Sequence, residues 1–204
     1  MNPGGGPPDV SRETSARLAV LAVLLRKWNP AINLVAPSTL DELEERHIAD
    51  SLQLVSLAPP GPKHWADLGS GGGFPGLVVA AVLAERAPAA RVTLVESDRR
   101  KASFLRTAAR GMGLDVTVRA ERAEAIAPLG AEVVSARALA PLHTLLGLAE
   151  RHMAAGGLAL FPKGARAQEE IEVARKQWRF VLESHMSRTD PQASVLVVRE
   201  ITRA

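Results

Sequence analysis

The chain has 204 residues and no cysteine. This absence excludes disulfide bonds, thiolate metal sites and cysteine nucleophiles together. The sequence also lacks any run of about 18 uninterrupted apolar residues, and residues 1–10 are rich in glycine and proline instead of forming a charged and then apolar leader. We therefore expect neither a membrane span nor a secretory signal, and a cytoplasmic protein. The five histidines are too scattered for a metal-ligand cluster, so we expect no bound metal.

Length and composition indicate a single core. The chain is 47% hydrophobic, which suffices for one complete core and leaves room for only a small extra element. Its 25 basic and 22 acidic residues give a net charge of +3, which weakly favours an anionic partner. We expect a monomer with a disordered segment at 1–10, a helical extension at 11–60 and the main domain at 61–204.

The main domain shows an α/β pattern. Beyond Pro59-Pro60-Gly61, apolar β-type runs alternate with helical patterns, which predicts an open, mostly parallel seven-stranded sheet with helices on both faces. Strands are expected at 64–68, 91–96, 115–120, 132–136, 158–164, 180–187 and 194–201, and helices after residue 76, at 99–112, from residue 141 and at 166–178.

One stretch, residues 64–76, organises the chain. It reads HWADLGSGGGFPG, an apolar run followed by a cluster of glycines and then by an apolar helical segment. That order is typical of a strand, a tight turn and a helix. Glycines permit positive φ and a close approach of backbone amides to a ligand at the helix N-terminus. The loop therefore predicts a nucleotide-type site at Gly69, Gly71, Gly72 and Gly73, with Ser70 expected to contact the same ligand.

Several classes of ligand could explain this glycine-rich loop. Gly71, Gly73 and Gly76 fit the dinucleotide fingerprint G-x-G-x-x-G, which is a weak signal alone. With Asp67 two residues before the first glycine, the stretch resembles the first motif of the Rossmann-like methyltransferases that use S-adenosylmethionine. A carboxylate suits the ammonium and sulfonium charges of that donor, whereas it would repel a pyrophosphate. A Walker loop is excluded because no Gly-Lys-Ser/Thr follows. A merely structural glycine turn stays open.

Further candidates stand at the ends of the later strands. Glu96 lies where an acidic side chain binds ribose hydroxyls, although it could simply favour the dipole of the next helix. Ala123 and Glu124 follow the third strand and are expected to frame an adenine. Arg137 follows the fourth strand, at the strand end nearest the expected reaction centre. Lys163 ends the fifth strand, where it either reaches an anion or only closes the strand.

The extension is predicted to contain two helices. The first is capped by Ser11 and ends at residues 29–30, and the second covers 38–55 with Ser38 and Asp41 arranged as a capping box. In the second helix His47 points into the apolar stripe with Asp50 three residues on, which predicts either a buried hydrogen bond between them or a role at the cleft. Arg46 lies at the polar edge, free to meet an anion.

Seven segments in order carry a resemblance: KWNPAINLVAP, ERHIADSL, DLGSGGGFPG, LVESDRRKASFLR, RAEAI, SARALAPL and FPKG. Together they resemble the bacterial small-subunit ribosomal RNA guanine-N7 methyltransferases, the RsmG or GidB family (glucose-inhibited division protein B). The resemblance implies a Rossmann-like class I methyltransferase that acts on 16S rRNA or a small-subunit particle, with S-adenosylmethionine as donor and S-adenosylhomocysteine as product. It also implies donor contacts at Gly69, Phe74, Ala123, Glu124 and Arg137. The family loop usually reads G-T-G-P-G-L-P-G, so Ser70, Gly72 and Phe74 are departures, although Phe74 keeps an apolar wall.

The residues and motifs that the sequence lacks also indicate which kind of atom could be methylated. Methylation at pyrimidine C5 commonly uses a cysteine, and amino-group methylation an Asn/Asp-Pro-Pro-aromatic loop, whereas this chain has neither. Guanine N7 already has an available lone pair, so no dedicated general base is expected and Arg137 would position a substrate. Contacts to RNA are expected from Arg46, His47, Arg137 and Lys163. The alternatives are a nicotinamide-dependent oxidoreductase and a noncatalytic RNA-binding protein.

Overall fold

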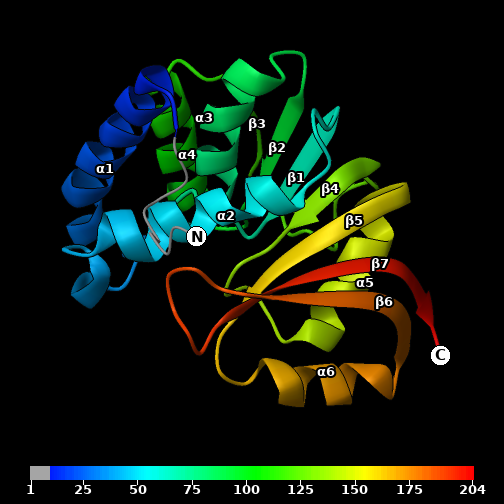
Figure 1. Cartoon of the computed structure of the whole chain (residues 1–204). Coiled ribbons are helices and arrows are strands. Elements are labelled where there is room, and N and C mark those ends of the chain that lie inside the picture. Colours follow the sequence, from blue (N-terminus) through cyan, green and yellow to red (C-terminus); the bar gives the residue numbers. More distant parts are fainter. Residues whose placement is uncertain (1–9) are drawn as a thin grey trace, which may run out of the picture.

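The computed structural model describes residues 10–204, so the segment predicted to be disordered lies almost wholly outside the described residues. Within them seven strands form one sheet of order β3-β2-β1-β4-β5-β7-β6 (Figure 1). The pairs among β1 to β5 are parallel, and β7 runs antiparallel to both β5 and β6. The strands are β1 (His64–Leu68), β2 (Arg91–Val95), β3 (Thr117–Arg119), β4 (Ala131–Ser135), β5 (Met153–Lys163), β6 (Trp178–Met186) and β7 (Ser194–Arg203). The mostly parallel α/β sheet is confirmed.

Helices cover both faces of the sheet (Figure 1). One core cluster joins the sheet to α1 (Arg12–Ile32), α2 (Asp50–Leu57), α3 (Gly76–Arg86) and α4 (Arg99–Gly111). The other joins it to α5 (Leu142–His152) and α6 (Ala167–Arg175). Because the order of the parallel strands reverses between β1 and β4, the carboxyl ends of these strands open a crevice at that point. The predicted domain boundary near residue 60 stays a prediction, since the extension shares its core with the sheet.

Helix α1 continues past the predicted end. Ser11 caps it as expected, accepting a hydrogen bond from the Thr14 backbone at 3.0 Å. Pro30 lies inside the helix, which ends only at Asn33 in a left-handed conformation. The buried Asn29 side chain accepts from the backbone amides of Leu34 and Val35 at 2.8 and 2.9 Å. The proline removes only one donor, and Asn29 organises the turn that follows.

The second predicted helix is wrong in its first half. Ser38 makes no cap; it lies in a short 3-10 turn, η1 (Pro37–Thr39), and a π-helical turn, η2 (Glu44–Ala49), precedes α2. A π turn is wider than an α turn and rotates the side chains that follow it, and such turns occur frequently at functional sites. This turn decides where His47 and Asp50 point.

Smaller boundary differences have local causes. β3 is shorter than predicted, at Thr117–Arg119, and β5 begins earlier, at Met153, because it pairs with β4 from Ala131 onward. The helix predicted over 166–178 ends at Arg175. The buried Trp178 instead starts β6, where its ring contributes to the core beneath α5 and α6.

Candidate active site

The glycine-rich loop connects β1 to α3 at the crevice. Its start is fixed to β2, because the backbone amides of Gly69 and Ser70 both donate to the Val95 carbonyl, at 2.8 and 3.1 Å. Gly73 has φ 91°, and a β-carbon there would lie 2.6 Å from Leu77 Cδ1. A β-carbon on Gly69, at φ 69°, would lie equally close to a Leu139 methyl. Both positions therefore favour glycine for conformation, and at Gly73 the buried Leu77 also leaves no space for a β-carbon.

A cavity of about 560 Å³, called here the loop cavity, opens over this turn. It brings together Gly69, Ser70, Gly71, Phe74, Glu96, Arg137 and His47 from the predicted site residues, with further walls from 34–36 and 138–139. A smaller cavity of about 170 Å³, the side cavity, contains Ala123 and Glu124. The two cavities share Gly69, Ser97 and Leu139, so they adjoin one another at the carboxyl ends of the strands.

Glu96 stands at the edge of the loop cavity just after β2. One carboxylate oxygen accepts from the Gly71 amide at 2.9 Å and the other from the Asp98 amide at 2.8 Å. Both bonds come from backbone, so the carboxylate is held in one orientation. Each oxygen has a second lone pair, which leaves Glu96 able to accept hydrogen bonds from a ligand.

Asp67 does not make the direct ligand contact that was predicted. Its side chain has no exposed surface and does not line the loop cavity. One oxygen accepts from Ser135 Oγ at 2.7 Å and the other from the Gly76 amide at 3.1 Å. Burial raises the pKa of Asp67 to about 6, against the opposing effect of these hydrogen bonds. Asp67 therefore joins β1, β4 and the N-terminus of α3 and supports the loop from below.

A compact cluster of His47, Phe74 and Arg137 joins the extension to the loop. The His47 ring stacks on Phe74 with centroids 5.1 Å apart, and the Arg137 guanidinium lies 5.2 Å from the Phe74 centroid. Arg137 Nη2 donates to His47 Nδ1 at 2.8 Å. Since the Thr39 hydroxyl donates to the Ala36 carbonyl, its oxygen accepts from His47 Nε2 at 2.8 Å. This assigns the neutral tautomer with its proton on Nε2.

The predicted hydrogen bond between His47 and Asp50 is absent. The π turn directs His47 toward Thr39 and Arg137, whereas Asp50 accepts from Gln53 at 2.7 Å and pairs with Arg137 at 3.4 Å. Burial first, and then the charges of Arg137 and Arg46, lower the pKa of His47 to about 4. His47 is therefore uncharged at neutral pH and serves as an acceptor for the guanidinium.

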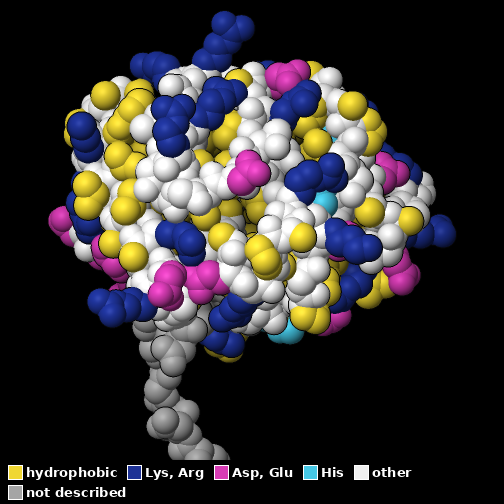
Figure 2. All heavy atoms as spheres, turned by 90° about the horizontal axis from the view of Figure 1, so that it is seen from above, with side chains coloured by type: hydrophobic (Ala, Val, Ile, Leu, Met, Phe, Trp, Pro, Cys, Tyr) yellow, Lys and Arg dark blue, Asp and Glu magenta, His cyan; other side chains and the backbone are white. Residues whose placement is uncertain are grey.

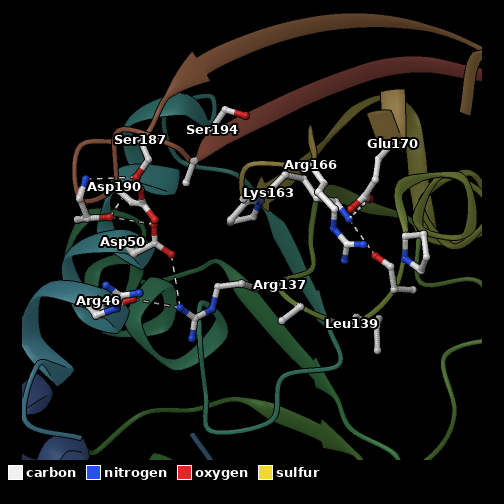
Figure 3. A pocket seen from close by; sticks show the side chains of 17 residues that line it. Arg46, Asp50, Arg137, Leu139, Lys163, Arg166, Glu170, Ser187, Asp190 and Ser194 are labelled. Carbon is white, nitrogen blue, oxygen red and sulfur yellow. Dashed lines mark hydrogen bonds and ion pairs between the residues drawn. The ribbon is translucent and has the colours of Figure 1, made fainter. Parts of the chain in front are cut away.

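A further cavity of about 470 Å³, the rim cavity, lies on the other side of Arg137 (Figure 3). Residues 137–139 line both the rim cavity and the loop cavity, so this short segment separates them. Ala138 adopts φ 53°, a left-handed conformation that is uncommon for a residue with a β-carbon. The remaining walls come from α2, the end of β5, the start of α6 and the loop between β6 and β7.

Arg46 and Lys163, both predicted to contact RNA, differ in how exposed their side chains are at the rim cavity. Arg46 is exposed, with one weak ion pair to Glu42 at 3.6 Å. Lys163 is not free, because its ammonium donates to Glu170 at 2.7 Å and to the Ala140 carbonyl at 2.9 Å. Its side chain is 10% exposed. The ammonium thus connects β5 to α6 and to the segment after Arg137, and a contact between Lys163 and RNA stays a prediction.

Sequence comparison decides the family. Residues 14–194 match the profile of the GidB family, described as rRNA small subunit methyltransferase G. The chain belongs to this family. It is 51% identical over 195 residues to ribosomal RNA small subunit methyltransferase G of Ruegeria sp. (strain TM1040), covering 96% of this chain and 95% of the relative. With the protein of the same name from Rhodospirillum centenum (strain ATCC 51521 / SW) it shares 54% identity over 192 residues, 94% of this chain and 87% of the relative. The resemblance to the GidB family is thus confirmed.

Solved structures confirm the fold of this GidB-family chain. A TehB-like SAM-dependent methyltransferase from Corynebacterium glutamicum superposes with a TM-score of 0.59 at 14% identity, covering 92% of this chain and all of that one. M. jannaschii TYW2 in complex with AdoMet gives 0.57 at 13% identity, covering 78% and 76% of the two chains. The Rossmann-like methyltransferase architecture is therefore confirmed.

Residues 187–190, in the loop between β6 and β7, were missed as site residues. Thr189 Oγ1 donates to Asp50 at 3.3 Å, and Gln53 Nε2 donates to Ser187 Oγ at 3.2 Å. The only signal in the sequence is the polar turn SRTDPQ between two apolar runs. Within residues 10–204 no group of metal-ligating side chains is assembled, and no helix is long and apolar enough to cross a membrane.

Proposed function

We propose that this GidB-family chain transfers the methyl group of S-adenosylmethionine to N7 of a guanine in 16S ribosomal RNA and leaves S-adenosylhomocysteine. One observation carries the proposal: the glycine-rich loop, Glu96 and Arg137 meet at one cavity, and a second cavity begins directly behind Arg137. A transferase needs two adjoining sites for its two substrates. Family membership sets aside the nicotinamide-dependent oxidoreductase.

The residues at the loop and side cavities fit the donor. Glu96 has lone pairs free for ribose hydroxyls, and the side cavity at Ala123 and Glu124 suits an adenine. Gly69 and Gly71 have no side chains of their own, so a ligand could approach their backbone groups closely. Phe74 supplies an apolar wall, and Arg137 a cation for the donor's carboxylate. The positions of these residues at the two cavities and the resemblance of the loop support these assignments.

The rim cavity is the proposed place of the acceptor. Arg46, Arg137 and Arg166 line it, which suits an approaching phosphate chain. Figure 2 shows Lys and Arg side chains spread over one face of the molecule, with Asp and Glu side chains between them. The protein is proposed to act as a monomer in the cytoplasm, on free 16S rRNA or on a small-subunit particle.

The proposed chemistry requires positioning and no general base. S-adenosylmethionine supplies a methyl group on a positively charged sulfur, which the free lone pair of guanine N7 can attack without deprotonation. Burial lowers the pKa of Arg137 from its usual value, opposed by Asp50, but a guanidinium stays charged at neutral pH. His47 has both ring nitrogens engaged. Arg137 and His47 therefore hold geometry, and alignment can supply much of the acceleration.

Transfer of a labelled methyl group from S-adenosylmethionine tests the proposal. Incorporation into 16S rRNA, free or in particles, is expected, with a single-turnover rate that is flat between about pH 6 and 9. Arg137→Ala should abolish most of the rate, whereas Arg110→Ala, on the outer face of α4, should leave it unchanged. Isothermal titration with S-adenosylmethionine addresses the noncatalytic alternative, which predicts no donor binding. A rate that rises with pH and loses this rise in a His47 or Glu124 variant would contradict positioning-only catalysis.

A further inference from the structure

The ion pair between Arg137 and Asp50 presents a donor beside an acceptor in the rim cavity. Arg137 Nη1 and Asp50 Oδ2 are 3.4 Å apart, and both side chains line the cavity (Figure 3). They are 19% and 15% exposed, so each keeps some accessible surface. Nη1 donates to Asp50 Oδ2 at 3.4 Å and to the Arg46 carbonyl at 3.3 Å. Both bonds are long, so a ligand edge can replace them and complement the donor and the acceptor.

Both members of the pair are held in place by neighbours. Asp50 Oδ1 accepts from Gln53 at 2.7 Å and from Thr189 at 3.3 Å, which leaves Oδ2 facing Arg137 with a free lone pair. Arg137 Nη2 is fixed by His47 at 2.8 Å. These partners come from η2, α2 and the β6–β7 loop, so the orientation of the pair depends on the docked extension. A fixed pair can discriminate between ligands because neither group can turn to suit a wrong one.

We propose that this pair reads the target base: Arg137 donates to O6 of guanine, and Asp50 Oδ2 accepts from N1–H. The inference rests on the proposed function and names the atoms that make the acceptor site specific for guanine. Adenine presents the opposite pattern at these two positions, an amino donor at C6 and a lone pair at N1. An adenine would therefore place a donor against the guanidinium and a lone pair against the carboxylate.

The order of atoms along the guanine edge agrees with the order of groups in the protein. N7, O6 and N1 follow one another around the base. Arg137 lines both the loop cavity and the rim cavity, whereas Asp50 lines only the rim cavity of the two. With O6 on Arg137 and N1 on Asp50, N7 is the atom on the side of the loop cavity. A cavity of about 470 Å³ is within the size range of small-ligand sites, so it can accept a base turned out of the RNA stack.

Base analogues test this reading with the unaltered protein. The RNA carries inosine, N1-methylguanosine or 2-aminopurine in place of the methylated guanine, and the probe is the single-turnover rate of methyl transfer. Inosine keeps O6, N1–H and N7, and its rate should stay within about threefold of guanine. N1-methylguanosine loses the N1 donor and should be about 10- to 100-fold slower, as expected for a lost charge-assisted hydrogen bond. 2-Aminopurine loses both O6 and N1–H and should be slower by at least this factor.

A matched pair of variants connects the effect to Asp50. In Asp50→Asn the penalty for N1-methylguanosine relative to guanine should shrink to about threefold or less. Asp190→Asn removes a carboxylate from the same cavity and should keep the full penalty. Retained affinity for S-adenosylhomocysteine shows that both variants are folded. Equal rates for guanine and N1-methylguanosine in the wild-type protein, or an undiminished penalty in Asp50→Asn, would overturn the inference while leaving methyl transfer intact. No transfer to unmodified RNA would instead overturn the proposed function and this inference with it.

Discussion

Replacement of His47 by glutamine should alter how stability depends on pH. In the native protein His47 accepts from Arg137 at 2.8 Å, and burial and nearby arginines lower its pKa from 6.5 to about 4. The unfolded chain therefore takes up a proton first as the pH falls. The free energy of unfolding therefore decreases as the pH is lowered from about 6.5 to 4. Above about pH 6.5 the histidine has no such effect.

The size of the effect follows from the two pKa values. At about 1.4 kcal/mol per pKa unit, the difference between 6.5 and about 4 corresponds to roughly 3 kcal/mol. His47 is only partly buried, so solvent screens part of this, and we expect about 1–2 kcal/mol. Asp67, whose native pKa is raised to about 6, acts in the opposite direction between about pH 3.8 and 6. Because Asp67 is present in both proteins, the difference between them isolates His47.

Urea unfolding at several pH values between about 7 and 4.5 measures this difference. The free energy of unfolding of the wild type should fall by about 1–2 kcal/mol more than that of His47→Gln over this range. His185→Gln is the control, because the His185 side chain is 43% exposed. A constant difference between wild type and His47→Gln at every pH would refute the assignment of a neutral, Arg137-bound His47.

Three further predictions concern the donor, the RNA and the loop. Glu96→Ala should weaken binding of S-adenosylmethionine by about 10- to 100-fold in isothermal titration, and wild-type affinity would exclude Glu96 as a ribose ligand. Arg46→Glu should weaken RNA binding and reduce its salt dependence while sparing donor affinity; an equal loss of donor binding would make Arg46 a folding residue. Gly76→Ala would place a methyl against Leu94 and 2.6 Å from the Asp67 carboxylate, so urea unfolding should show a loss of about 1–3 kcal/mol, and unchanged stability would contradict this packing.

The sheet and the loop could be predicted from local patterns. Apolar runs alternating with helical periodicity are sufficient for a mostly parallel sheet, and a glycine cluster after a strand marks the turn. Glu96 was found because its place depends only on the end of β2. Each of these inferences depends only on residues that are close together in the sequence. Local backbone geometry then determines the elements, with small errors in the predicted ends of helices and strands.

The remaining site features depend on contacts between distant segments. The π turn at η2 has no simple sequence signal, yet it directs His47 toward Arg137, which lies 90 positions further along the chain, and not toward Asp50. Lys163 was placed correctly at a strand end, but its pairing with Glu170 requires the docking of α6. Asp67 carries the right charge in the right motif, and only the structure reveals that Ser135 and the Gly76 amide enclose it.

The most direct test of guanine-N7 methylation is mass spectrometry of nucleosides from 16S rRNA. The RNA is isolated from cells that contain this protein, from cells that lack it, and from deficient cells that regain either the wild type or Arg137→Ala. One 7-methylguanosine should vanish without the protein and return with the wild type but not with Arg137→Ala. An unchanged content of 7-methylguanosine in 16S rRNA after loss of the protein would contradict the proposed function.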